Sequence, residues 1–461
     1  MRIAFVLGIC FLVACSLHAV EPVKPSPFIV GACTHFGQGK GLLAANLSLI
    51  RQAGITSIRD EVVWRGIERE KGRLKMPEEW DAFVRRAAAS GADPMLILDY
   101  GNPFYDGGDK PLSDEATEGF ARYSEFVVGH FKGVVRHYEI WNEYDIKIGS
   151  KSPGSAENYV KLIQKVYPRI KAIDPSITVY AGAMTPGGVK NGWLEKMLAE
   201  GGLAFMDVVS IHTYNYGRPG RERTPEAWAE WMQQVQGLIT KYNHGNPAPL
   251  CVTEMGWPTQ IDKRGIPPRL SADYLARMYL LSRTMPFLKG IWWYDFQDDG
   301  WMATYNESNF GIVRPDLTPK PAYFTLASVA TLAAKAQYEG RIDAGDPDIF
   351  ILKFRESSGR QVWAIWSAHE DDDWQVTLRT SAASPKPLLI SEVGRRPVER
   401  PWGSRHWADE RNAPGMPRDL DITVRGTPWL LMGDLAGVTL TGVKQRPFPE
   451  ATRGASMTPA N

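Results

Sequence analysis

The sequence predicts an α/β fold, a closed (β/α)8 TIM barrel, followed by a small antiparallel β-sandwich. Three observations lead to this prediction. The chain has 461 residues, which suits a barrel of about 250 to 300 residues with a smaller module attached. From residue 28 to about 334, short apolar strands alternate with longer amphipathic stretches, as in βα units of a parallel sheet. From about residue 335 the pattern changes to period-two strands separated by polar turns, which is typical of a sandwich.

Eight short apolar segments are expected to form the barrel, with helical stretches between them. A barrel of this kind carries its functional groups on the loops that follow the strands. The expected strands are 28–34, 55–59, 94–99, 135–141, 178–183, 208–212, 250–253 and 290–294. The clearest helical stretches are 79–90, 115–131, 156–173, 225–242 and 271–283.

The second domain is expected over residues 335–445, with a disordered tail over 446–461 that is rich in Pro, Thr and Gly and has no periodicity. This module could bind carbohydrate or brace the barrel. We favour bracing, because its tryptophans Trp363, Trp366 and Trp374 suit a core at least as well as a binding platform. The expected strands are 348–355, 361–367, 374–380, 387–393, 419–424 and 428–432.

The N-terminus predicts export. Met1 and Arg2 precede a short apolar run over 3–14, so residues 1–19 read as a signal segment that is too short to span a membrane. Residues 12–15, Leu-Val-Ala-Cys, resemble a bacterial lipobox, in which Cys15 would be acylated; cleavage after Ala19 is the alternative. We therefore expect a periplasmic, cell-surface or extracellular protein, with a lipid anchor at Cys15 as one form.

Composition excludes some partners. With 53 basic and 52 acidic side chains the formal charge is +1, which provides no field for gathering polyanions, so nucleic acid is not an expected partner. The 16 Trp residues suit the apolar faces of sugars, although most tryptophans simply pack in cores. Past the signal segment the remaining thiols are Cys33 and Cys251. Both are expected as buried free thiols, with a disulfide as the alternative.

Two short stretches carry the functional prediction. Residues 137–143, His-Tyr-Glu-Ile-Trp-Asn-Glu, place Glu143 at the end of the fourth strand, and residues 250–257, Leu-Cys-Val-Thr-Glu-Met-Gly-Trp, place Glu254 at the end of the seventh. Taken alone, each glutamate could be a rim charge. A pair of carboxylates at the tips of buried strands indicates a site, because their desolvation is costly. Cleavage of a glycosidic bond needs such a pair, one to protonate the leaving oxygen and one to meet the cationic sugar carbon.

Asn142-Glu143 on strand four together with Glu254 on strand seven resembles the large clan of retaining (β/α)8 glycoside hydrolases, in particular families 39 and 5, and family 39 most of all. The resemblance spans residues 28–332, and an appended β-sandwich is common in those families. It implies that Glu143 is the general acid and base, that Glu254 is the nucleophile and that Asn142 binds the sugar 2-hydroxyl. It also implies an enzyme that cleaves O-glycosidic bonds of a poly- or oligosaccharide by double displacement, with no metal or organic cofactor.

The same resemblance extends to residues around the two glutamates. Arg59 matches the clan's arginine beside the nucleophile, Tyr214 matches a tyrosine that hydrogen-bonds the nucleophile, and His212 matches a histidine that lines the sugar site. A rim salt bridge of Arg59, a core histidine and a packing tyrosine are the alternatives. Trp293 on strand eight is expected as the aromatic platform under the sugar, with Trp292 turned outward, and Trp257 is a second stacking candidate.

One difficulty concerns strand alternation. Strict alternation places Glu143 on the opposite face from Asn142, so both reach one site only if the strand has already ended there. Two other functions share this scaffold. A non-catalytic carbohydrate-binding protein would have no reason to aim Arg59, Glu143 and Glu254 at one sugar carbon. A transglycosylase would use the same residues as a hydrolase.

Overall fold

The computed structural model describes residues 27–370, 372–381, 388–400 and 418–446. The expected signal segment, including Cys15 and Ala19, lies outside the described residues, as does residue 447 onward of the expected tail. Among the described helices, none is long and apolar enough to cross a lipid bilayer.

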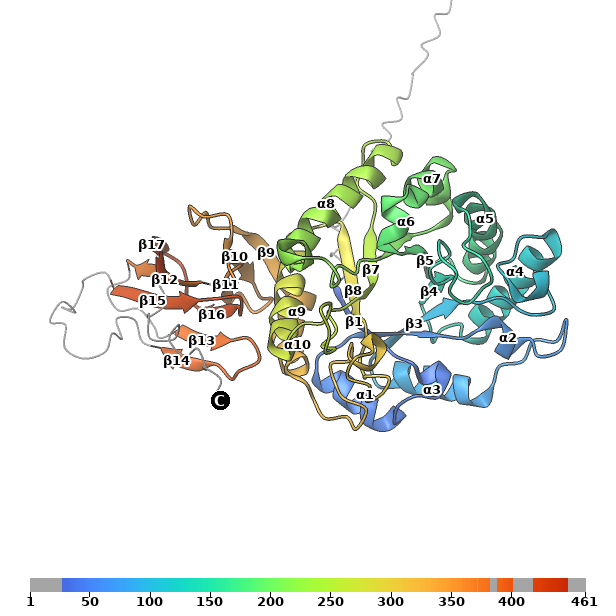
Figure 1. Ribbon diagram of the computed structural model, residues 1–461, viewed down its shortest axis with the longest axis horizontal. Coiled ribbons are helices and arrows are strands. Elements are labelled where there is room, and N and C mark those ends of the chain that lie inside the picture. The colour runs from blue at the N-terminus through green and yellow to red at the C-terminus, as the bar shows by residue number, and fades with distance from the viewer. Residues whose placement is uncertain (1–26, 371, 382–387, 401–417, 447–461) are drawn as a thin grey trace, which may run out of the picture.

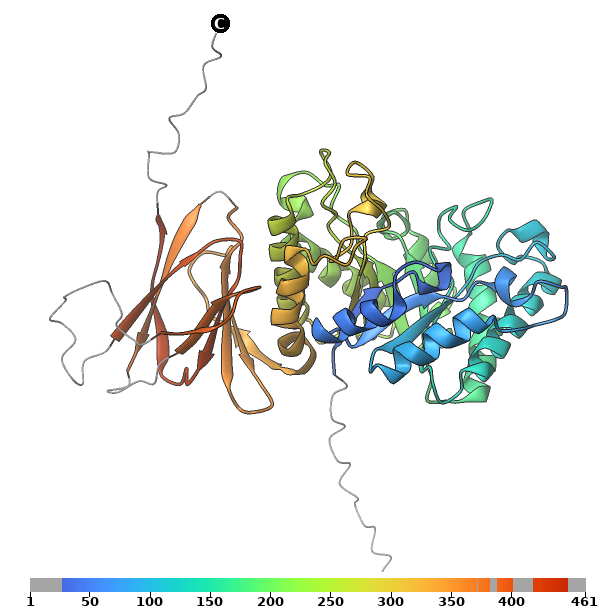
Figure 2. The ribbon, with the colours of Figure 1, turned by 90° about the horizontal axis from the view of Figure 1, so that it is seen from below.

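The expected barrel is confirmed. Eight parallel strands close into a ring in the order β1 to β8, and the helices surround them (Figure 1). Seen from below, the loops at the carboxyl ends of the strands project together from one side of the barrel (Figure 2). The strands are β1 Ile29–Cys33, β2 Ser57–Glu61, β3 Asp93–Leu98, β4 His137–Ile140, β5 Thr178–Met184, β6 Val208–His212, β7 Leu250–Met255 and β8 Leu288–Trp293.

The helices of the barrel pack their apolar faces on the strands, and several begin at a side-chain cap. Ser113, Ser155 and Thr224 each accept a hydrogen bond from the backbone N–H three residues later, which satisfies a donor left free at the helix start. The helices are α1 Leu43–Gln52, α2 Trp64–Ile67, α3 Glu78–Ala89, α4 Asp114–His130, α5 Ala156–Ile173, α6 Pro186–Lys190, α7 Trp193–Ala199, α8 Pro225–Tyr242, α9 Pro268–Ser282 and α10 Pro321–Lys335. Short 3-10 helices are η1 Phe36–Gln38, η2 Asp106–Gly108, η3 Gly202–Phe205, η4 Gly220–Arg223 and η5 Asn306–Ser308.

The barrel interior contains both thiols and one of the two tryptophans of β8. Cys33 and Cys251 are buried and free, as expected. Trp292 belongs to the same interior cluster, so the expectation that it turns outward is wrong. Gly31 on the neighbouring strand makes room for the indole, because a Cβ at that position would lie 2.3 Å from the Trp292 ring.

The C-terminal module is an antiparallel β-sandwich, as expected. One sheet has the order β14-β13-β16-β11-β10-β9 and the other β15-β12-β17, and side chains such as Ile365, Val376 and Leu431 fill the space between them. Three strands, β9, β14 and β17, were not expected. The strands are β9 Gln337–Arg341, β10 Ile349–Arg355, β11 Gln361–Ser367, β12 Asp373–Thr380, β13 Leu388–Glu392, β14 Val398–Arg400, β15 Arg418–Val424, β16 Trp429–Gly433 and β17 Val438–Arg446.

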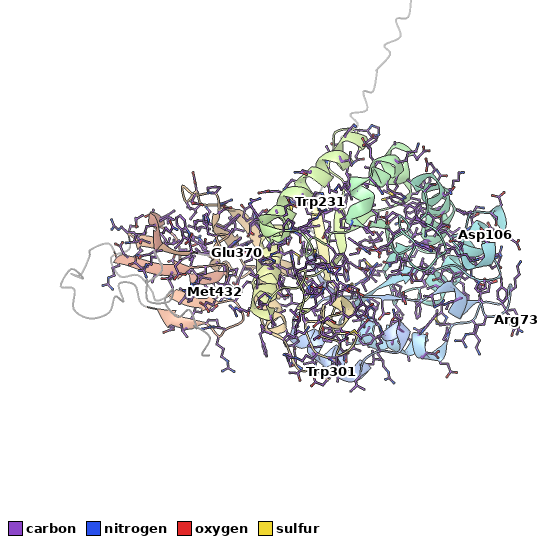
Figure 3. The ribbon with its side chains drawn as sticks, viewed as in Figure 1. Arg73, Asp106, Trp231, Trp301, Glu370 and Met432 are labelled. Atoms are coloured by element: carbon purple, nitrogen blue, oxygen red, sulfur yellow. The ribbon has the colours of Figure 1, made fainter. Side chains whose placement is uncertain are left out.

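A buried polar network joins the sandwich to the barrel. Trp366 on β11 donates from Nε1 to Glu226 Oε1 on α8 over 2.9 Å, and Arg277 on α9 donates from Nε to the same oxygen over 2.8 Å. Tyr274 on α9 hydrogen-bonds Glu370, which lies on the side of the sandwich that faces α8 and α9 (Figure 3). Separating a buried charge from its partner is costly. The contacts of Glu226 therefore hold the module against the barrel and favour a bracing role.

Candidate active site

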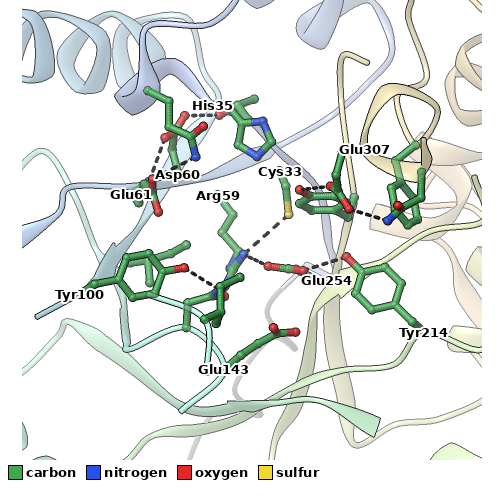
Figure 4. Close-up of a pocket in the computed structure, with 18 of the residues that line it drawn as sticks. Cys33, His35, Arg59, Asp60, Glu61, Tyr100, Glu143, Tyr214, Glu254 and Glu307 are labelled. Carbon is green, nitrogen blue, oxygen red and sulfur yellow. Dashed lines mark hydrogen bonds and ion pairs between the residues drawn. The ribbon is translucent and has the colours of Figure 1, made fainter. Parts of the chain in front are cut away.

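Glu143 and Glu254 come from opposite sides of the barrel mouth and face one cavity (Figure 4). An oxygen of Glu143, an oxygen of Glu254 and a ring nitrogen of His212 all lie within 4.8 Å of one another. His212 Nδ1 is 2.9 Å from Glu143 Oε1 and 3.5 Å from Glu254 Oε2. The two carboxylates are therefore close enough to act on one sugar carbon.

The backbone after β4 resolves the alternation difficulty. The strand ends at Ile140, and Trp141 and Glu143 adopt left-handed conformations with φ of 67° and 50°. Such a conformation costs about 1 to 3 kcal/mol at a residue other than glycine and is typical of functional sites. The turn buries Trp141 while directing both Asn142 and Glu143 into the cavity.

A β-bulge places Glu254 on the cavity side of β7. Ile211 on β6 pairs with Val252, but the next residue, His212, pairs with Glu254, so Thr253 is one extra residue in β7. A bulge shifts the alternation by one position, and Glu254 thereby joins Cys251 on the inner face of the barrel. Without the bulge, Glu254 would point toward the helices.

Arg59 on β2 connects the site from inside the barrel and is only 3% exposed. Its Nη1 donates to Glu254 Oε1 over 2.6 Å, its Nε donates to Glu139 Oε2 over 2.7 Å, and its Nη2 donates to Asn142 Oδ1 over 2.8 Å. A guanidinium has its donors in a fixed planar fork, so Arg59 sets the relative positions of the nucleophile candidate and Asn142.

Replacing Arg59 with Ala should destabilise the fold strongly. Glu139 and Glu254 would remain buried without their cation, and breaking such a network costs about 3 to 5 kcal/mol. Urea unfolding measures this loss. The control is Arg85→Ala on α3, where a half-exposed pair with Asp81 is broken and a loss of about 1 kcal/mol or less is expected. Equal losses in the two variants would contradict the bridging role of Arg59.

The surroundings push the pKa values of the two glutamates in opposite directions. Burial, reinforced by the nearby charge of Glu254, raises the pKa of Glu143 above its ordinary value of 4.5. Burial alone would also raise the pKa of Glu254, but the charges of His212 and Arg59 outweigh it and lower that pKa. Tyr214 adds to this effect by donating its hydroxyl to Glu254 Oε2 over 2.8 Å. Glu143 is thus suited to hold a proton and Glu254 to act as an anion.

The cavity has a volume of about 300 Å³, at the small end of ligand sites. Four tyrosines and one phenylalanine form part of its walls. The rings of Tyr214, Tyr294 and Phe310 pack edge to face or tilted, with centroids 5.3 to 6.1 Å apart. The other lining residues include Tyr100, which accepts a hydrogen bond from Asn142 Nδ2, and Tyr216. Aromatic faces beside carboxylates are suited to a sugar ring.

No protein-family model and no curated protein sequence matches the chain. Solved structures do. A family 39 glycoside hydrolase from Bacteroides cellulosilyticus WH2 matches with 26% identity over 88% of this chain and 81% of its own, with a TM-score of 0.69. A monomeric β-xylosidase from Caulobacter crescentus CB15 matches with 16% identity over 88% and 97%, TM-score 0.58. A GH5_18 protein from Streptomyces cattleya matches with 14% identity over 66% and 79%, TM-score 0.55. The chain is a (β/α)8-barrel glycoside hydrolase that resembles family 39.

In this glycoside hydrolase, six of the predicted site residues lie together. Glu143, Glu254, Asn142 and Tyr214 line the cavity with Arg59, and His212 lies directly behind them in contact with both glutamates. The alternatives of a rim salt bridge for Arg59 and a packing-only role for Tyr214 do not fit these contacts, because both side chains bind Glu254.

The prediction that Trp293 and Trp257 stack on the sugar is wrong. Trp293 is fully buried on the outer face of β8, where it packs against Trp257 with ring centroids 6.0 Å apart and donates to Phe310 O. Trp257 is also fully buried and donates to Arg223 O. Neither lines the cavity. Because Trp292 occupies the interior of the barrel, alternation along β8 turns Trp293 toward the helices, and the next residue, Tyr294, reaches the site.

Several cavity residues were not predicted. Glu61 lies two positions after Arg59 on β2, so the period-two rule alone could have found it. Tyr294, Asn306, Glu307 and Phe310 come from the long segment that follows β8. The sequence carries no periodic signal there, and only the folded loop brings these residues to the mouth.

Two groups at the mouth present metal-ligand atoms within 4.8 Å of one another: Glu143 with His212 and Glu254, and His35 with Asp295 and Asp299. In the first group Glu254 already pairs with Arg59, and in the second Asp299 pairs with Lys40 over 2.7 Å. Each resident cation disfavours an added metal ion by repulsion.

Proposed function

We propose that this glycoside hydrolase cleaves O-glycosidic bonds of an oligo- or polysaccharide with retention of configuration. The observation that carries the proposal is the close approach of Glu143 and Glu254, whose oxygens come within 4.8 Å. Retaining enzymes hold their two carboxyl groups about 5 to 5.5 Å apart, whereas inverting enzymes leave about 6.5 to 9.5 Å for a water molecule. An approach within this bound supports direct attack by one of the glutamates.

In the first step Glu254 attacks the anomeric carbon while Glu143 gives its proton to the departing oxygen. Arg59 and Tyr214 hold Glu254 ionised and oriented for this attack. In the second step Glu143, now a carboxylate, takes a proton from water, which displaces Glu254 and restores the starting state. Asn142 faces the cavity beside both glutamates and is placed to bind the 2-hydroxyl, a contact that strengthens in the transition state.

The decisive experiment uses the purified chain and a panel of aryl glycosides in both anomers, with oligosaccharides beside them. β-Xylosides belong in the panel because a similar structure is a β-xylosidase. Proton NMR at early times would show the configuration of the first sugar released, and we expect it to match that of the substrate. An inverted product would refute the mechanism, and binding without cleavage would make the chain a carbohydrate-binding protein. A product in which a second sugar replaces water would identify a transglycosylase.

The opposite pKa shifts predict a bell-shaped dependence of kcat/KM on pH. Activity needs Glu254 ionised and Glu143 protonated. Since the pKa of Glu254 is lowered, the acid limb should fall below pH 4.5, and since the pKa of Glu143 is raised, the basic limb should lie above it. Rates over pH 3 to 9 check this, and Glu143→Gln should remove the basic limb. A basic limb that survives this substitution would assign the acid role elsewhere.

We also propose that the protein is exported, on the evidence of the charged and apolar N-terminal residues 1–19. If Cys15 is acylated, the protein expressed in a bacterial host should partition with membranes, and Cys15→Ala should release it into the soluble fraction. Cys10→Ala, in the same apolar run, is the matched control and should leave the partitioning unchanged. A wild-type protein that is already in the soluble fraction, with its mature N-terminus at Val20, would favour cleavage after Ala19.

A further inference from the structure

The cavity that holds the two glutamates is ringed by additional acidic groups. Besides Glu143 and Glu254, the carboxyl side chains that line it are Asp60, Glu61 and Glu307. Asp60 is buried, and its oxygens accept hydrogen bonds from Thr34 Oγ1 and three backbone N–H groups. Glu61 and Glu307 are half-buried and stand on opposite sides of the cavity (Figure 4).

Glu307 is tied into the wall beside the nucleophile candidate. Its Oε2 accepts from the Tyr294 hydroxyl over 2.8 Å, and its Oε1 accepts from Asn306 Nδ2 over 2.6 Å. The Tyr294 ring packs edge to face on Tyr214, with centroids 6.1 Å apart, and Tyr214 binds Glu254. Glu307 is thus held next to the sugar position. Because a carboxylate oxygen accepts more than one hydrogen bond, it retains capacity for a sugar hydroxyl.

Glu61 stands at the other side, where Gln38 Nε2 donates to its Oε1 over 3.0 Å. Among the described residues, none donates a hydrogen bond to its second oxygen, Oε2. A sugar hydroxyl is a suitable donor for it.

The cations of the cavity do not offset these charges. Among the described residues that line it, the basic side chains are Arg59 and His35. Arg59 directs its donors to Glu139, Asn142 and Glu254. His35 Nδ1 lies 2.9 Å from Asp299 and 3.8 Å from Asp295. Each cation is thus already paired with carboxylates, and the cavity presents an excess of negative charge to a ligand.

We propose that Glu61 and Glu307 determine specificity by selecting a glycone without an acidic group, so that neutral sugars are accepted and uronic acids are rejected. This inference rests on the proposed hydrolysis of O-glycosides. The two carboxylates accept hydrogen bonds from sugar hydroxyls, which a neutral sugar supplies. A uronic acid brings a like charge into a confined cavity, where repulsion between carboxylates is poorly screened.

The test compares aryl xylosides, glucosides and glucuronides, and the corresponding arabinopyranosides, galactosides and galacturonides. A glucoside and a glucuronide differ at one carbon, where the glucoside carries a hydroxymethyl group and the glucuronide a carboxylate. We expect kcat/KM for the uronide to be lower by about 100-fold, the effect of roughly 2.8 kcal/mol of repulsion at about 6 Å. The variants Glu61→Gln and Glu307→Gln keep the size of the side chain and remove its charge. In at least one of them, the ratio of kcat/KM for the uronide to kcat/KM for the neutral glycoside should rise at least tenfold.

Glu79→Gln, on the exposed face of α3 and outside the cavity, is the control and should leave the ratio unchanged. Uronides cleaved as well as neutral glycosides would overturn the inference. So would a ratio that neither substitution changes, or a glucoside rejected as strongly as the glucuronide, since size and not charge would then discriminate. Failure to cleave any glycoside would instead refute the proposed hydrolysis, so the two failures are distinguishable.

Discussion

Glu254→Gly should lower kcat/KM by about 10⁴-fold or more, because it removes the group that forms the bond to the sugar carbon. The space left beside Arg59 and Tyr214 can admit a small anion. Azide should therefore restore part of the activity on an aryl glycoside with a good leaving group and give a glycosyl azide of inverted configuration. Initial rates with increasing azide and NMR of the product check this.

Glu61→Gly is the matched control, since it removes a glutamate from the same cavity on another strand. It should show neither the large loss nor the rescue, because Glu61 has no part in the covalent step. Activity retained in Glu254→Gly, or a rescue that occurs equally in the control, would overturn the assignment of Glu254.

Glu143→Ala should separate substrates by their leaving groups. Without its proton donor, a glycoside with a poor leaving group should lose about 10³-fold in kcat/KM, whereas one with a good leaving group should lose about tenfold or less. The difference arises because a weakly basic oxygen can depart as an anion without protonation. A series of aryl glycosides of graded leaving-group pKa measures the effect.

The plot of log kcat/KM against leaving-group pKa should be steep for Glu143→Ala and shallow for the wild type. His212→Phe is a useful comparison, because His212 contacts Glu143 but does not line the cavity. It should lower the rates for all leaving groups by a similar factor. Parallel plots for Glu143→Ala and the wild type would show that another group supplies the proton.

Much of the site follows from strand order. Counting apolar segments placed Glu143 at the end of the fourth strand and Glu254 at the end of the seventh. The structure has Glu143 in the turn that follows β4 and Glu254 within the last residues of β7. Arg59, His212 and Tyr214 were identified by the resemblance to the clan, and their positions at strand ends agree with it, because the carboxyl ends of parallel strands in a barrel meet at one mouth. Their contacts with the two glutamates are those of the folded protein. The catalytic roles of the two glutamates remain predictions, which the variants above test.

The local backbone could not be read from the sequence. Strict alternation fails at Asn142 and Glu143, where the chain turns through left-handed conformations, and at Glu254, where a bulge adds a residue to β7. The same limit explains the error at β8. Two adjacent tryptophans are equally apolar. Gly31 on the neighbouring strand β1 leaves the space in which Trp292, not Trp293, fills the interior.

By itself the sequence determined the order of the strands, the change from barrel to sandwich and the pair of glutamates, because hydrophobic periodicity and spacing along the chain are local properties. Only the tertiary structure decided which side chains share the cavity. Glu61 and Glu307 are 246 positions apart and line one pocket because β2 and the segment after β8 end at the same mouth. Close packing of glycines, aromatic rings and paired charges across the barrel selects one orientation for each side chain, and no single segment contains that information.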